Sequence, residues 1–168
     1  MKKTLRVLLP AGMVAVLAGA VALHAAAAQP SDGNHVEATF AEANLSITNR
    51  IADLGVFQLI NTGSGTLDGY GAATMVLDLT QDRSVHPCGA GSWTNAGIRR
   101  ITVAAGVLVL RELAYVCPTP SGLVGTSTWT VDGPSSTGVF AEARGDGTET
   151  IDLTTHTSTL SGKLHLAG

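Results

Sequence analysis

The segment Leu108–Val116, LVLRELAYV, carries the polar side chains best placed to meet a ligand. In a strand, Arg111 and Tyr115 would lie on one face, four residues apart, and Glu112 on the other. Polar groups in an apolar interior are costly unless they are paired or meet a ligand. Arg111 and Tyr115 are therefore candidate ligand-binding residues if they point inward. The alternative, that they point outward or form a paired structural cluster, stays open.

Two tryptophans are further candidates for ligand contact. Trp93 lies in a long connection, Gln81–Gly97, and connections of this length are usually functional or tied down. We expect Trp93 either to cover the mouth of a binding cavity or to plug one end of the core. Trp129 shares one face of an expected strand, Leu123–Val131, with Val131.

Motifs for catalysis or metal binding are scarce. The chain has no GxSxG, HExxH, P-loop or GxGxxG motif. The histidines of the expected mature chain lack ligand spacing, and Gly145-Asp146-Gly147 lacks the further acids of a calcium loop. We therefore expect no metal and no cofactor, and we assign no catalytic residue. The histidines in question are His35, His86, His156 and His165.

Cys88 and Cys117 are the two cysteines of the chain. In an oxidising compartment we expect them to pair, which would stabilise the fold by about 3–4 kcal/mol in the chain-entropy model. Two separate buried thiols are the alternative. Neither cysteine has CxxC or zinc-type spacing, so a catalytic or zinc role is not expected.

The element that must organise these residues is a predicted hairpin over Ser136–Leu166. From Val139 to Leu153, small or apolar side chains alternate with polar ones, and Phe140 and Glu149 interrupt the alternation. The return strand repeats the two-residue period through Leu160, Gly162, Leu164 and Leu166. This alternation predicts long strands with one buried and one solvent-exposed face. The unpaired edges of such strands must be covered, and closure of the sheet into a barrel removes them.

The remaining chain predicts further long strands and turns. Parity shifts near Phe40–Ala41, which a β-bulge explains, and a helix over Phe40–Ile47 is the rival interpretation. A turn is expected at Asn61–Gly65, and a hairpin around Ala105-Gly106. We therefore predict an all-β fold, a single eight-stranded antiparallel β-barrel. Its other strands are expected at Val36–Ile47, Asp53–Ile60, Thr66–Thr80, Ile98–Ala104, Val107–Val116 and Leu123–Val131.

The first 28 residues have the pattern of a secretory signal peptide. Lys2, Lys3 and Arg6 precede an apolar run, and Ala26-Ala27-Ala28 supplies a small-residue cleavage site. A transmembrane anchor is the competing interpretation, but no charged stop follows the run. We expect cleavage after Ala28, a β-barrel domain over 29–168, no membrane anchor, and a bacterial periplasmic or extracellular location.

Charge excludes some partners of the mature domain. Loss of three basic residues leaves seven Lys+Arg against 13 Asp+Glu, so the net charge falls from −3 to −6. No basic run survives, which argues against nucleic acid and anionic membrane surfaces as partners.

A resemblance to a known family is carried by the C-terminal segment. Thr137–Gly145, TGVFAEARG, resembles the TG-x-F-x-x-A-x-G segment of dirigent and allene-oxide-cyclase-like barrel proteins, and Leu160–Leu164 is similar to their closing strand. Gly65–Gly71 is compatible with an earlier strand. The resemblance implies an eight-stranded antiparallel barrel, often trimeric, with an apolar cavity. It also implies cofactor-free ring closure or radical coupling, without a motif that assigns active-site residues here.

Three functions follow as hypotheses. The first is a secreted barrel that binds a small apolar ligand in its interior. The second is a cyclase or stereochemical guide that acts by shape and a few polar groups. The third is a structural or adhesive protein with a filled barrel. An open interior pocket with converging polar groups favours the first two.

Overall fold

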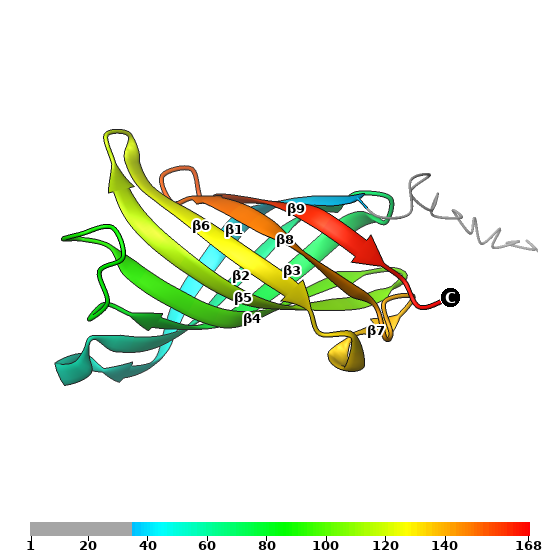
Figure 1. Cartoon of the computed structure of the whole chain (residues 1–168), viewed down its shortest axis with the longest axis horizontal. Coiled ribbons are helices and arrows are strands. Elements are labelled where there is room, and N and C mark those ends of the chain that lie inside the picture. The colour runs from blue at the N-terminus through cyan, green and yellow to red at the C-terminus, as the bar shows by residue number, and fades with distance from the viewer. Residues whose placement is uncertain (1–34) are drawn as a thin grey trace, which may run out of the picture.

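The computed structural model describes residues 35–168, and within them the chain forms a closed, tilted β-barrel (Figure 1). Eight long strands make the wall, and a two-residue strand, β7, lies against β5. Two short 3-10 helices, η1 (Ala52–Leu54) and η2 (Gly133–Ser135), lie in the connections. The strands are β1 (His35–Ile51), β2 (Val56–Leu67), β3 (Gly71–Asp82), β4 (Trp93–Val103), β5 (Gly106–Thr119), β6 (Gly122–Val131), β7 (Thr137–Gly138), β8 (Arg144–Asp152) and β9 (Thr157–His165).

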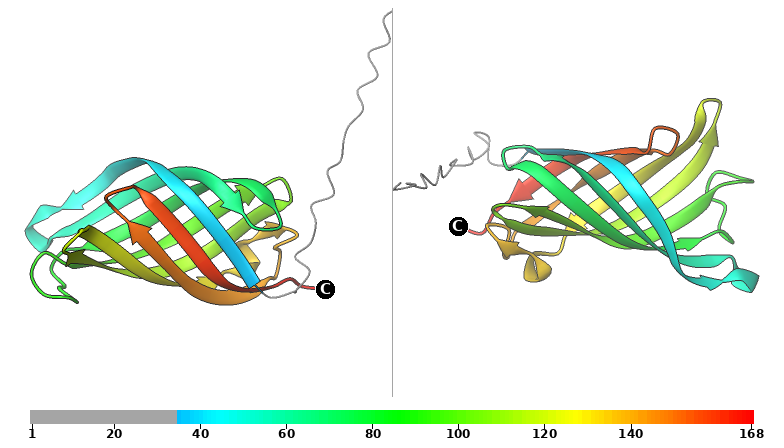
Figure 2. Two further views of the ribbon diagram at one scale, coloured as in Figure 1. Left: turned by 90° about the horizontal axis from the view of Figure 1, so that it is seen from above. Right: turned by 180° about the vertical axis from the view of Figure 1, so that it is seen from behind.

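Every neighbouring pair of wall strands is antiparallel, which confirms the predicted fold class. The wall runs β4-β3-β2-β1-β9-β8-β6-β5, and pairing of β4 with β5 closes it. The views from above and behind in Figure 2 show the same continuous, steeply tilted wall. Closure removes the free strand edges that an open sheet of this length would expose.

The two ends of the barrel differ in how they are filled. At the end where β9 finishes, an apolar plug fills the interior, and Phe140 is fully buried in it with Tyr70 4.8 Å away between ring centroids. The opposite end carries the β1–β2, β3–β4, β5–β6 and β8–β9 connections (Figure 1), and a pocket lies there. The chain thus packs its core at one end and leaves the other for a site.

The predicted strand over Val139–Leu153 is wrong in its first part. Residues 139–143 form tight turns, with Phe140 N–H donating to Thr137 O and Ala143 N–H to Phe140 O. Glu142 has a φ of 58°, which ends any extended run. Phe140 interrupts the alternation because its side chain turns into the barrel end, and β8 begins only at Arg144.

The predicted turn at Asn61–Gly65 is also wrong, because β2 runs straight through it. Gly63 and Gly65 are there for close approach to β1: a Cβ on Gly65 would lie 1.8 Å from the Thr39 carbonyl oxygen. The real turn lies between β2 and β3, where Tyr70 N–H donates to Leu67 O. β3 therefore begins at Gly71 and not at Thr66.

β1 is a strand throughout, so the helical interpretation of Phe40–Ile47 is wrong. Its register against β2 shifts between Glu42 and Asn44 and again between Ile47 and Asn49. The expected bulge is present, but it follows Glu42 and not Phe40. Beyond the bulge β1 continues at the open end of the barrel, where Ala43 and Leu45 line the pocket.

The β3–β4 connection is shorter than predicted, since β4 already begins at Trp93. Cys88 in this connection forms a disulfide with Cys117 near the end of β5, which confirms the predicted pairing. The hairpin around Ala105-Gly106 is confirmed as well, with Gly106 at a φ of 147°. Both features hold the ends of β4 and β5 together.

The predicted signal peptide, 1–28, lies outside the described residues. Between His35 and Gly168, no helix is long and apolar enough to cross a membrane.

Candidate functional site

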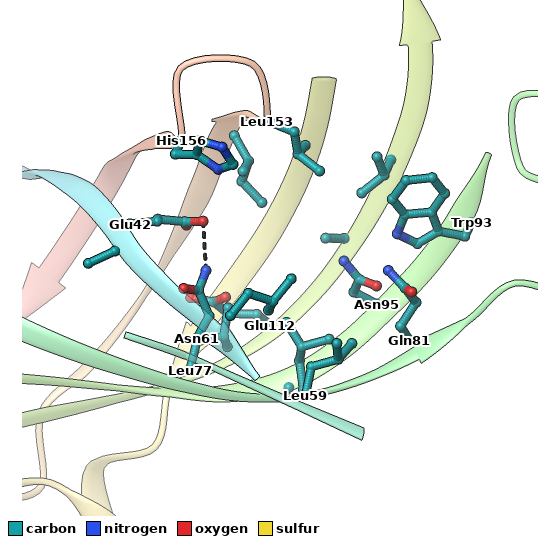
Figure 3. Close-up of a pocket in the computed structure, with 17 residues that line it drawn as sticks. Glu42, Leu59, Asn61, Leu77, Gln81, Trp93, Asn95, Glu112, Leu153 and His156 are labelled. Carbon is teal, nitrogen blue, oxygen red and sulfur yellow. Dashed lines mark hydrogen bonds between the residues drawn. The ribbon is translucent and has the colours of Figure 1, made fainter. Parts of the chain in front are cut away.

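A cavity of about 260 Å³ opens at the end of the barrel opposite the apolar plug (Figure 3). Its walls are mostly aliphatic, and its polar groups come from five of the eight wall strands and one turn. Such a concave, largely apolar site with a few convergent polar groups is typical of small-molecule binding. The polar residues are Glu42, Asn61, Gln81, Trp93, Asn95, Glu112 and His156, and the apolar ones include Leu59, Leu77, Leu79, Ala114, Val116, Ile151 and Leu153.

Of the four residues that the sequence suggested for ligand contact, Trp93 lines this cavity. Arg111 and Tyr115 lie on the outer face of β5: the Arg111 side chain is 63% exposed and pairs with Asp132 at 2.6 Å, and Tyr115 is 43% exposed. The inward face of β5 instead presents Glu112 and Ala114. The structure therefore brings neither Arg111 nor Tyr115 to the pocket.

The two faces of β5 were hard to distinguish because both are apolar near its start. Val109 is on the outer face yet only 3% exposed, because the segment after β6 covers it. Asp132 N–H donates to Val109 O, and Val109 N–H donates to Ser136 Oγ. Because this segment covers it, Val109 is buried like a core residue although it lies on the outer face of β5.

Trp129 faces inward but packs in the wall of the barrel and not in the pocket. Its indole lies over Gly147 and Gly162, two paired glycines whose Cβ atoms would come within 2.3 Å and 2.4 Å of the ring. The indole Nε1 donates to Thr148 O at 3.0 Å. Trp129 is therefore a satisfied core residue, 2% exposed.

Directly below the pocket lies a buried ionic cluster around Arg99. The Arg99 side chain is fully buried; its Nε lies 2.7 Å from Glu112 Oε1, and its Nη2 contacts Glu112 Oε2 and Glu149 Oε1. Its Nη1 donates to Ser158 Oγ at 3.2 Å. Glu112 is shared between this cluster and the pocket, so the cluster forms the pocket floor.

Burial controls the protonation of this cluster. Desolvation, with the neighbouring carboxylates of Glu112 and Glu42, raises the pKa of Glu149 to about 8 despite the attraction of Arg99. Desolvation also raises the pKa of Glu112, against the charge of Arg99 and its hydrogen bond. For Arg99, the carboxylates outweigh the desolvation penalty and raise the guanidinium pKa. Glu149 is therefore largely protonated near neutral pH, while Arg99 is charged.

One side of the pocket carries a second acid (Figure 3). Glu42 Oε2 accepts a hydrogen bond from Asn61 Nδ2 at 2.6 Å. His156, in the β8–β9 turn, lies on the same side, and its carbonyl accepts the Glu42 backbone N–H at 2.8 Å. That turn places His156 at a φ of 53°.

The other side of the pocket carries neutral polar groups from β3 and β4 (Figure 3). Within the described chain, Trp93 Nε1 and Asn95 Oδ1 are buried without a hydrogen-bond partner. The exposed Arg83 guanidinium lies 5.1 Å from the Trp93 ring centroid, and its Nε donates to Gln81 Oε1 at 2.9 Å. A ligand between the two sides would meet acceptors on one and both donors and acceptors on the other.

Sequence reasoning left open whether Glu112 faces inward, and it missed Arg99 and Glu149 as interior groups although both gave a signal. Glu149 interrupts the alternation of its strand because it points into the barrel. Arg99 and Arg100 are adjacent in a strand, so one of them had to face inward. Glu42 has the parity of the inward-facing Ala38 and Phe40, but a parity shift at Phe40–Ala41 assigns it to the outer face, whereas the shift in the structure follows Glu42.

In the part of the chain that the structure describes, no three His, Cys, Asp or Glu side chains group as metal ligands would. The site defines a class: a closed antiparallel barrel with an apolar pocket over a buried acid–arginine cluster. A scan against protein-family models, a search of curated proteins and a search of solved structures each found no match to this chain.

Proposed function

We propose that this protein binds a small, largely apolar ligand in the pocket at the open end of its barrel. The observation that carries the proposal is the cavity itself: about 260 Å³, walled by leucines and valine and entered beside Trp93. A filled barrel, which a purely structural role requires, would have packed this end as Phe140 packs the other. The ligand gains affinity from burial of its apolar surface.

Export is part of the proposal. The Cys88–Cys117 disulfide supports it, because such bonds persist in oxidising compartments. The predicted signal peptide adds support from the sequence, and the bacterial periplasm or medium is the proposed destination.

Binding of the neutral dye N-phenylnaphthylamine tests the ligand proposal. We expect its emission to rise with wild-type protein and not with Ala114→Phe, since Ala114 lines the pocket and a larger side chain would fill it. The matched control is Leu113→Phe, the neighbouring position on the outer face, which is 45% exposed. Equal dye binding by both variants would show that the dye, and hence the ligand, does not use this cavity.

A second candidate, a cofactor-free cyclase or stereochemical guide, is favoured by one observation. Glu112 at the pocket floor contacts Arg99, which also contacts Glu149, so an acid whose pKa is raised to about 8 lies one side chain below the pocket. The resemblance to dirigent and allene-oxide-cyclase-like barrels supports the same candidate and stays a prediction. Loss of turnover of a cyclising substrate in Glu112→Gln, with dye binding retained, would support it over simple binding.

A further inference from the structure

Acidic side chains outnumber basic ones around the pocket. Among its lining residues, Glu42 and Glu112 carry carboxyl groups, His156 is the remaining titratable side chain, and none is lysine or arginine. Glu149 lies below, so three glutamates act on one buried guanidinium. Even with Glu149 protonated, two acids act on one cation. A cleft lined by one sign of charge attracts ligands of the other.

Arg99 makes no ion pair with Glu42 among the described residues. Its Nε and Nη2 are engaged by Glu112, its Nη2 also by Glu149, and its Nη1 by Ser158. Among residues 35–168, no lysine, arginine or histidine nitrogen lies within the 4.0 Å ion-pair distance of the Glu42 carboxylate. Glu42 is therefore an acid at the pocket wall without a cationic partner.

The Glu42 carboxylate also has acceptor capacity to spare. Its one side-chain hydrogen bond is the donation from Asn61 Nδ2, whereas a carboxylate offers about four lone-pair sites. Leu59 and Leu77 line the same pocket, so water is in part replaced by hydrocarbon around it. A charge in such surroundings interacts more strongly with an opposite charge than it does in open water.

We propose that the ligand is an apolar molecule bearing a protonated amine, with the ammonium group held by Glu42 and the hydrocarbon against the leucine wall. The inference rests on the ligand-binding function proposed above and names its chemical class. An anionic ligand would meet the two pocket acids, and Arg83, which is exposed and does not line the pocket, is held by the Trp93 ring and by Gln81. A neutral ligand of the same shape gains burial but no charge-assisted hydrogen bond.

Three probes that share the same hydrocarbon chain and differ in head group separate a cationic, a neutral and an anionic ligand: n-octylamine, n-octanol and n-octanoate. Each is titrated as a competitor of N-phenylnaphthylamine on wild-type protein at neutral pH, where the amine is protonated and the acid ionised. We expect the amine to bind roughly tenfold more tightly than the alcohol, and the carboxylate to bind most weakly. Equal or weaker binding of the amine relative to the alcohol would overturn the inference.

Paired variants test the role of Glu42. Glu42→Gln keeps the size of the side chain and its contact with Asn61 but removes the charge, so we expect roughly tenfold weaker amine binding and unchanged alcohol binding. Glu37→Gln is the matched control, the same change on the outer face of the same strand, where Glu37 is exposed. Amine binding that drops equally in both variants, or in neither, would overturn the assignment to Glu42.

Failure of the inference and failure of the proposed function are distinguishable. If the alcohol displaces the dye as well as the amine does, the pocket binds apolar ligands and only the amine class is wrong. If wild-type protein binds neither the dye nor any probe, the proposed function is wrong and the inference falls with it.

Discussion

At the scale of single residues, the molecule depends most on one arginine. Arg99 is fully buried, and it is the cation that compensates Glu112 and Glu149 inside the barrel. Removing Arg99 leaves the buried Glu112 carboxyl group without its cation, and breaking a buried ion pair in this way costs about 3–5 kcal/mol. We therefore expect Arg99→Met to lower the free energy of unfolding by that amount in urea denaturation.

Arg100→Met is the internal control for this experiment. Arg100 is the next residue of β4, but it is exposed on the outer face, and surface substitutions usually change stability by about 0.5 kcal/mol or less. Similar losses in the two variants would show that the Arg99 cluster contributes little to stability.

Glu149 gives the protein a pH-dependent stability of known sign. Desolvation raises its pKa from 4.5 to about 8 in the folded state. Between these values the folded chain holds a proton that the unfolded chain has lost, so rising pH favours unfolding. The contribution is fully present below 4.5 and lost above about 8. Glu112, whose pKa is also raised, acts in the same direction.

Urea unfolding of wild type and Glu149→Gln across this range measures the effect. We expect wild-type stability to fall from about pH 5 to about pH 8 and the variant to depend on pH much less, because glutamine does not titrate. The acids with lowered pKa, Asp82, Asp132 and Asp152, act at or below their usual 3.8 and leave this range unaffected. A variant curve parallel to that of wild type would contradict the role of Glu149.

At the scale of elements, the β3–β4 connection controls the pocket mouth. It is tied to β5 by the Cys88–Cys117 disulfide, and it leads into Trp93 at the start of β4. A bond that closes a separation of 29 residues stabilises by about 3–4 kcal/mol in the chain-entropy model. We expect Cys88→Ser with Cys117→Ser to lose about that much stability.

The same double variant is expected to loosen the connection in the folded state. Arg83, which stacks on Phe57 and Trp93, would then become a faster trypsin site. Mass spectrometry of the first cleavage product identifies the cut. Wild type digested under identical conditions is the comparison, and an unchanged rate at Arg83 would mean that the disulfide does not hold the mouth.

The elements also show what the sequence can and cannot predict. Alternation predicted the fold class and most strands, because a barrel wall has a wet outer and a packed inner face. It failed where glycines serve close packing of strands: Gly63 and Gly65 look like a turn but lie inside β2. It failed again at Val139–Ala143, where a turn happens to alternate.

For the site, sequence reasoning offered Trp93 as a residue at the cavity mouth and left open which face of β5 is interior. The choice depended on knowing that the segment around Ser136 covers Val109, a contact between residues 27 apart in the chain. The sequence indicated an interior acid only where it interrupts the two-residue alternation. Such an interruption does not predict which residue the acid contacts. Glu149 meets Arg99 from a strand that is not its neighbour in the sheet.

At the scale of the whole molecule, the barrel divides its length between stability and binding. Phe140, fully buried with Tyr70 beside it, closes one end, while Trp93 lines the pocket at the other. Between them, the Arg99 cluster separates a dry apolar plug from the pocket. A substitution in the plug should therefore lower stability and leave ligand binding nearly unchanged. A substitution at the pocket mouth should weaken ligand binding and cost less stability.

Phe140→Ala and Trp93→Ala test this division. Phe140→Ala empties a packed site and should cost about 3–5 kcal/mol of unfolding free energy, while the folded protein still binds N-phenylnaphthylamine. Trp93→Ala removes a partly exposed ring from the pocket mouth, so it should cost less stability but weaken dye binding several-fold. Urea denaturation and dye titration of both variants, each below its unfolding transition, give the comparison. If Trp93→Ala proved the less stable variant, or if Phe140→Ala lost the dye while folded, the two ends would not be independent, and the pocket would have to be treated as part of the core.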